Sequence, residues 1–123
     1  MCSDNPQLKK FLPLTPAAFS ILLALSDGDK HGYAIMQEAT RRTGKKMGPG
    51  TLYGLIKRML ADGWIVEQDE RPDPELDDER RRYYHLTDLG QRVASREAER
   101  LAQLVNLARR QGLLPDADRR SAP

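Results

Sequence analysis

The strongest periodic pattern in the chain lies between Pro49 and Gly63. Its apolar residues follow the i, i+3, i+4, i+7, i+8 spacing of one buried helix face and are Leu52, Leu55, Ile56, Met59 and Leu60. Pro49 suits the first turn of a helix, and Gly63 after Asp62 suits its end. The pattern therefore predicts a helix from Pro49 to Asp62.

An apolar run near the N-terminus predicts an earlier helix, from Thr15 to Leu25. Thr15 is a favourable N-cap, and Pro16 fits the first helical position. The two lysines before this run also make it look like a secretory signal, an alternative that the two prolines within the run argue against.

A second helix is predicted from His31 to Thr43, ended by Gly44. His31 stands at its start, where we expect it to act as a capping or packing residue. The chain thus carries three helical patterns before the residue pattern changes.

After Gly63 the residue pattern is typical of β-strands. Residues 64–68 and 82–86 are rich in β-branched and aromatic side chains, and the loop between them holds two prolines, which predicts a β-hairpin. Thr87 is then an N-cap for a long helix from Asp88 to about Gln111. The fold class is mainly α with a β-hairpin (α+β).

Three helices followed by a hairpin are the parts of a winged helix-turn-helix, which presents its third helix to the DNA major groove. We expect a flexible N-terminal arm at 1–14, a DNA-binding domain at 15–87, a dimerisation helix at 88–112 and a C-terminal tail at 113–123.

The distribution of charge supports a polyanionic partner more than the net charge of +2 does. Residues 41–58 hold six basic side chains and no acidic one, whereas residues 69–79 hold seven acidic side chains and one arginine. A basic segment of this kind around a predicted recognition helix is the electrostatic pattern expected of a DNA-binding domain. A solvated charged face is the alternative.

The face of the third helix opposite its apolar stripe carries two glycines, which let a helix backbone approach base edges closely, together with hydroxyl and basic side chains. In the hairpin, alternation puts Arg80 and Arg82 on one face and Arg81 on the other. The candidate DNA-binding residues are Lys45, Lys46, Gly50, Thr51, Tyr53, Gly54, Lys57, Arg58, Arg80, Arg81 and Arg82.

Two alternatives remain open for this face. Gly48 and Gly50 could merely shape the turn into the helix, and the ring of Tyr53 could pack partly against the core.

The long last helix has more apolar surface than a domain of this size can cover, which predicts a second copy of the chain as its partner and leaves a different protein as the alternative. The candidate interface residues are Phe19, Leu22, Leu23, Leu89, Val93, Leu101, Leu104, Val105 and Ala108. Because this helix has no aromatic residue, no aromatic effector is predicted on it. An effector site near Trp64, Tyr83 or Phe19 stays open.

Several classes of function are not expected. One cysteine allows no intramolecular disulfide, which fits a reducing intracellular compartment, and two histidines are too few for a zinc site of the usual kind. No base–nucleophile arrangement can be named, so we predict no enzyme activity, no metal and no cofactor. The apolar runs are too short to span a membrane.

Four short motifs together resemble the PadR family of bacterial transcriptional regulators. They are His31-Gly-Tyr-Ala-Ile35, Gly48-Pro-Gly-Thr-Leu-Tyr-Gly54, Arg80-Arg-Arg-Tyr-Tyr84 and Leu86-Thr-Asp-Leu-Gly90. With one C-terminal helix, the chain resembles the family's short subgroup. The resemblance implies a dimeric winged-helix repressor that binds operator DNA in a prokaryotic cytoplasm. The rival hypothesis is a winged-helix protein-interaction module without DNA binding.

Overall fold

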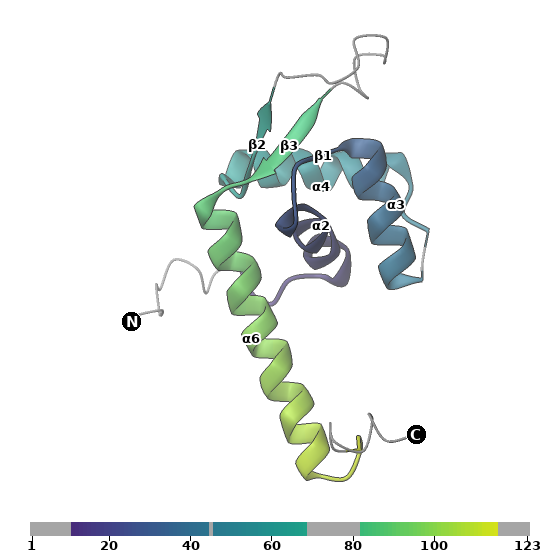
Figure 1. The fold of residues 1–123 in the computed structure, drawn as a ribbon, viewed down its shortest axis with the longest axis vertical. Coiled ribbons are helices and arrows are strands. Elements are labelled where there is room, and N and C mark those ends of the chain that lie inside the picture. Colours follow the sequence, from purple (N-terminus) through teal and green to yellow (C-terminus); the bar gives the residue numbers. More distant parts are fainter. Residues whose placement is uncertain (1–10, 45, 69–81, 116–123) are drawn as a thin grey trace.

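The computed structural model describes residues 11–44, 46–68 and 82–115. In Figure 1 the last helix runs away from the other helices, which gather beside a small sheet. In chain order the elements are α2 (Pro16–Ser26), β1 (Lys30–His31), α3 (Gly32–Thr43), α4 (Pro49–Asp62), β2 (Ile65–Gln68), β3 (Tyr83–Leu86) and α6 (Asp88–Arg110). The α+β winged helix-turn-helix predicted from the sequence is confirmed.

The helix ends show why these boundaries could be predicted. Thr15 accepts a hydrogen bond from the backbone of Ala18, and Thr87 caps α6 in the same way. His31 caps α3, since its Nδ1 accepts the N–H of Ala34 at 3.2 Å. Gly44 and Gly63 end α3 and α4 in the left-handed conformation that glycine adopts without strain.

The sheet has three antiparallel strands in the order β1-β3-β2, one more than the predicted hairpin. The additional strand, β1, pairs Lys30 with Tyr84, and His31 with Tyr83. A run of two residues is too short to show alternation, so no periodic pattern predicts this strand. The loop between β2 and β3 lies outside the described residues.

The core surrounds α2, which packs against α3 and against the first half of α6. The apolar run that also resembles a secretory signal forms this central helix. Leu22 and Val93 have no exposed surface within one chain, so their assignment to a dimer interface is corrected: they belong to the chain's own core. Leu22 was misplaced because α2 is covered from two sides, by α3 and by α6, and Val93 because the first half of α6 packs against α2.

Thr87 joins the end of α4 to the start of α6. Its hydroxyl donates to the carbonyl oxygens of Gly63 and Trp64, at 2.7 and 2.9 Å, and accepts the N–H of Gly90. Gly90 packs so closely that a Cβ there would overlap the Trp64 carbonyl. The Leu86-Thr-Asp-Leu-Gly90 motif therefore fixes α6 and the β2–β3 hairpin, which is called the wing below, at one angle to α4.

Candidate nucleic-acid interface

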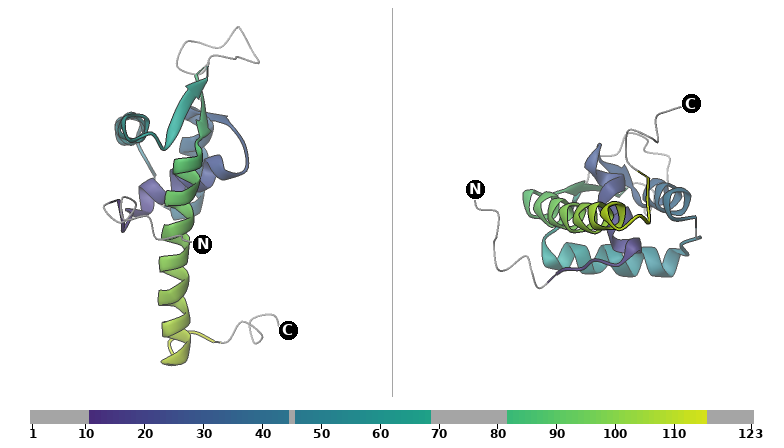
Figure 2. Two further views of the ribbon diagram at one scale, coloured as in Figure 1. Left: turned by 90° about the vertical axis from the view of Figure 1, so that its left-hand side faces the viewer. Right: turned by 90° about the horizontal axis from the view of Figure 1, so that it is seen from below.

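Helix α4 buries one face and leaves the other in solvent. Leu52, Ile56 and Met59 are buried in the core, whereas the predicted DNA-binding residues Gly50, Thr51, Gly54, Lys57 and Arg58 are exposed. The exposed face thus brings together five of the residues predicted from helical periodicity. In Figure 2, α4 lies at one side of the molecule, where other elements do not cover its outer face.

Packing among the described residues does not require the two exposed glycines of α4. A Cβ at Gly50 or Gly54 would meet no atom within 4 Å, and neither residue has a positive φ. Gly48, which precedes the helix, has an ordinary φ of −74°. The interpretation that these glycines only shape the turn into the helix therefore has no conformational support.

Tyr53 lies between the core and the surface. Its half-buried ring packs against the core cluster, as the alternative interpretation of this residue expected. The hydroxyl reaches the first turn of α3, where it fills the space beside Gly32. Tyr53 therefore has a structural role in addition to any contact with a ligand.

The cations of the basic segment are not equally available. Arg41 and Arg42 form ion pairs with Glu38, at 2.6 and 3.1 Å. Arg41 first, and Arg42 second, hold the pKa of the Glu38 carboxyl below its ordinary value. The sequence analysis did not predict this pairing, because Glu38 lies just before the basic segment of residues 41–58.

Three cations outside this pairing are exposed and belong to the predicted DNA-binding set: Lys46, Lys57 and Arg58. Three other members of the set, Lys45, Arg80 and Arg81, lie outside the described residues. Arg82 is described, and its guanidinium Nε lies 3.2 Å from a carboxylate oxygen of Glu67.

A groove of about 400 Å³ separates α4 from the wing. Lys57 stands on its α4 side and Arg82 on its wing side, so two cations from different elements flank one channel. Sequence reasoning missed two further residues of the groove, Glu67 and Tyr84. Each lies two positions from an apolar residue on its strand, Ile65 or Leu86, and so shares that residue's face, which was the available signal. Their pairing depends on the strand register.

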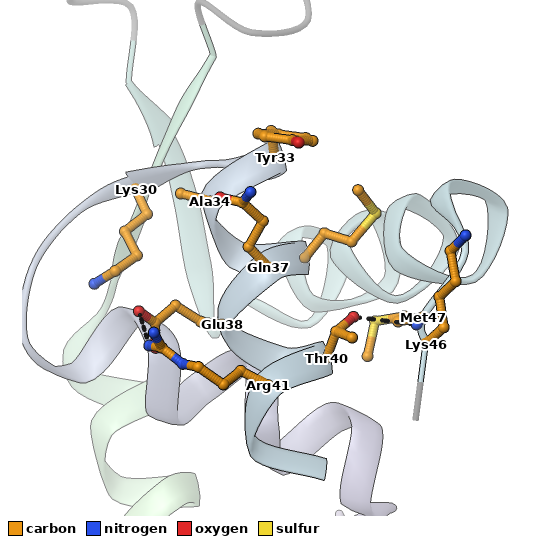
Figure 3. A pocket seen from close by; sticks show the side chains of 10 residues that line it. Lys30, Tyr33, Ala34, Gln37, Glu38, Thr40, Arg41, Lys46 and Met47 are labelled. Atoms are coloured by element: carbon orange, nitrogen blue, oxygen red, sulfur yellow. Dashed lines mark hydrogen bonds and ion pairs between the residues drawn. The ribbon is translucent and has the colours of Figure 1, made fainter. Parts of the chain in front are cut away.

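Two other depressions bear on the open question of an effector. One of about 680 Å³ lies on the outer face of α3 (Figure 3), where Lys30 is already paired with Asp27 and with the carbonyl oxygen of Ala24. The other, of about 220 Å³, is lined by Trp64 and Phe11, whose rings meet edge to face at 5.0 Å. Neither depression identifies a ligand.

Tyr83, one of the residues near which an effector site stays open, and His85 both make contacts within the fold. Tyr83 meets the ring of His31 edge to face at 5.5 Å. The Nδ1 atom of His85 lies 2.7 Å from a carboxylate oxygen of Asp29, which ties β3 to the turn after α2. Within the described ranges, no three His, Cys, Asp or Glu side chains are grouped as a metal site would require.

The second half of α6 projects beyond the other helices and the sheet (Figure 1). Leu104, Val105 and Leu107 are 51%, 38% and 43% exposed. Leu101 and Ala108 on this half, and Phe19 and Leu23 on α2, are partly exposed, while Leu89 packs partly against the core. No helix in the described part of the chain is both long and apolar enough to cross a bilayer.

The helices α2, α3 and α4, the small sheet and the exposed face of α4 define a winged helix-turn-helix protein. The model of the PadR-like family of transcriptional regulators matches residues 21–96. The transcriptional regulator Rv3488 of Mycobacterium tuberculosis is 32% identical over 85 residues, which make up 69% of this chain and 75% of that protein. The chain belongs to the PadR-like family of transcriptional regulators.

Other proteins are similar to this chain in sequence or in fold. An uncharacterized 37.1 kDa protein in transposon TN4556 of Streptomyces fradiae is 35% identical over 88 residues, covering 72% of this chain and only 24% of that relative. A PadR family regulator of Clostridium difficile is 22% identical, with 78% of this chain and 97% of that one covered and a TM-score of 0.63. A PadR-like transcription factor of Bacteroides fragilis is 20% identical, with 87% and 96% covered and a TM-score of 0.65. The two solved structures support the fold.

Proposed function

We propose that this regulator is a homodimeric, sequence-specific DNA-binding repressor of the prokaryotic cytoplasm. In this proposal, α4 enters the major groove of an operator and the wing lies along the phosphate backbone, which blocks access of polymerase to the promoter. Its role is regulatory rather than enzymatic.

The exposed face of α4 is the observation that carries the DNA-binding proposal. Gly54, inside the helix, lowers helix stability by about 1 kcal/mol relative to alanine, and Gly50 in the first turn also costs stability, yet nothing among the described residues requires either glycine. A backbone that must lie close to base edges gives a reason for their presence. Thr51 at the helix start and Lys57 and Arg58 further along then supply contacts to phosphate.

The dimer proposal rests on the continuity of one stripe along α6. This stripe is buried at Val93 and Glu97 and continues at helical spacing through Leu101, Leu104 and Ala108, where the described part of the chain covers it only in part or not at all. A second copy supplies the missing cover and matches paired half-sites on DNA. We assign to the interface Phe19, Leu23, Leu89, Leu101, Leu104, Val105 and Ala108, and add Leu107.

Fluorescence anisotropy tests the DNA-binding proposal. The probes are the DNA upstream of the protein's own gene and a shuffled duplex of equal length, each titrated across a salt series. We expect tighter binding to the native fragment and an affinity that falls steeply as salt rises. Equal affinity for the two duplexes would contradict sequence-specific regulation.

A double variant tests which face binds. Lys57→Ala with Arg58→Ala should weaken binding to both duplexes and flatten the dependence on salt. The matched control, Arg92→Ala with Arg110→Ala, removes the same charge from exposed positions on α6 and should bind as the wild type does. A folded wild-type dimer that binds neither duplex would favour the protein-interaction module instead.

A further inference from the structure

The wing carries an ion pair at the point where it faces the recognition helix. The side chain of Glu67 on β2 reaches Arg82, which precedes β3, and the carboxylate oxygen lies 3.2 Å from the guanidinium Nε. Glu67 stands opposite Tyr84 in the strand register, so both side chains lie on the sheet face that lines the groove. The pair therefore sits on the groove's wall.

The charges around this groove are unbalanced in favour of cations. Lys57 on α4 and Arg82 on the wing are its two basic lining residues, and Glu67 is its one acidic lining residue in the described part of the chain. Burial first, and the Glu67 carboxylate second, raise the pKa of the Tyr84 phenol, which thus stays neutral beside them. Among the described residues, Glu67 is accordingly the one negative charge that a phosphate entering this groove would meet.

We propose that Glu67 sets the affinity of this protein for DNA by competing with a backbone phosphate for Arg82. The inference rests on the proposed DNA binding and adds a residue to it. In the free protein Glu67 holds the guanidinium at the groove. On binding, a phosphate between Lys57 and Arg82 takes the place of the carboxylate. Glu67 is thus a positioning residue that acts through Arg82.

The exposure of the pair makes this exchange feasible. The side chains of Arg82 and Glu67 are 58% and 35% exposed, and ion pairs in such surroundings are weak because water and salt screen them. A phosphate, by contrast, engages two cations from opposite sides of the groove. The carboxylate therefore lowers the affinity without preventing binding.

The test compares wild type with Glu67→Gln on a mixed-sequence duplex at low salt, where binding depends on phosphate contacts rather than on the operator. Glutamine keeps an oxygen that can accept from Arg82 but removes the charge. We expect Glu67→Gln to bind about two- to fivefold more tightly, the range that exposed ion pairs contribute. The matched control is Glu99→Gln on α6, which removes an exposed carboxylate paired with Arg96 and should leave the affinity unchanged.

Arg82→Ala, alone and combined with Glu67→Gln, shows whether Glu67 acts through Arg82. The gain from Glu67→Gln should shrink when Arg82 is absent. An equal or larger gain without Arg82 would overturn the competition and indicate direct repulsion of DNA. If the wild type binds DNA and Glu67→Gln binds with the same affinity, the role of Glu67 is overturned and the proposed DNA binding is not. No binding by folded wild type would overturn the proposed function, and this role with it. Circular dichroism establishes that each variant is folded.

Discussion

The phenol of Tyr53 occupies the space that a side chain on Gly32 would need. A Cβ on Gly32 would lie 2.6 Å from the Tyr53 hydroxyl oxygen and about as close to the ring, at 3.0 Å. Two motifs far apart in the sequence, His31-Gly-Tyr and Pro-Gly-Thr-Leu-Tyr53, thus meet where the first turn of α3 crosses α4. This contact helps set the angle between the two helices of the helix-turn-helix.

Gly32→Ala should therefore destabilise the fold. The added methyl group forces the Tyr53 ring to move within a half-buried site, and overpacking of this kind costs about 1–3 kcal/mol. Urea denaturation followed by circular dichroism measures the loss. In a Tyr53→Phe background the nearest atom is gone, so the same substitution should cost less. An equal cost in both backgrounds would mean that the hydroxyl does not limit the space.

Gly54→Ala should have opposite effects on stability and on DNA affinity. Because the position is exposed and a Cβ meets no atom within 4 Å, alanine should stabilise the helix by about 1 kcal/mol and raise Tm by a few degrees. The new methyl group would stand between the α4 backbone and DNA and weaken binding. Calorimetry and anisotropy measure the two effects.

The control for this variant is Ser95→Ala, an exposed change on α6 that also favours helix but lies on a different element. It should leave DNA affinity unchanged. A Gly54→Ala protein that binds DNA as tightly as the wild type would remove this face of α4 from the interface.

The extent of sequence-based prediction differs between local and long-range features. The bounds of α4 were predictable because its apolar stripe, Pro49 and Gly63 all lie within one segment. β1 was not, because its two residues become a strand only by pairing with β3. The cover that α3 and α6 give to Leu22 depends in the same way on how helices pack, and this is why Leu22 was assigned to the wrong surface.

The candidate site likewise has local features that the sequence predicts and long-range contacts that it does not. The exposed face of α4 follows from helical periodicity, so its glycines and cations could be named from the sequence. The pairing of Glu67 with Arg82 joins two strands across a long loop, and the packing of Tyr53 beside Gly32 joins two helices. Such contacts depend on strand register and crossing angle, which no local pattern specifies.

Leu104→Glu should separate the proposed dimer. Leu104 is 51% exposed in one chain, and a two-fold interface would bury it twice. Loss of that apolar burial, with a charge in its place, should weaken dimerisation about a hundredfold or more. Sedimentation velocity measures the effect. The control, Asn106→Glu, puts the same charge on the opposite face of α6 and should remain dimeric. Equal behaviour of the two variants would contradict the assigned interface.

Glu97 should make the free energy of unfolding depend on pH in the acidic range. Its side chain is 2% exposed and receives two hydrogen bonds from Arg100, at 2.9 and 2.7 Å. Arg100 chiefly, and a backbone hydrogen bond from Leu14, hold the pKa of this carboxyl below its ordinary value of 4.5 against the effect of burial. A lowered pKa in the folded state means that the stabilisation is present above the ordinary value and is lost as pH falls through the folded one.

Glu97→Gln tests this dependence through the free energy of unfolding. At pH near 7 the variant should be less stable than the wild type by about 1–2 kcal/mol, since the Arg100 guanidinium then donates to a neutral amide oxygen instead of a carboxylate. The difference should shrink as pH falls below 4.5, because the wild-type carboxyl then becomes neutral as well. Urea midpoints at a series of pH values measure it. Glu99→Gln, at a carboxylate that is 63% exposed, should show almost no difference at any pH. A Glu97→Gln deficit that stays constant into acid would mean that side-chain packing, and not the charge on Glu97, joins α6 to the segment before α2.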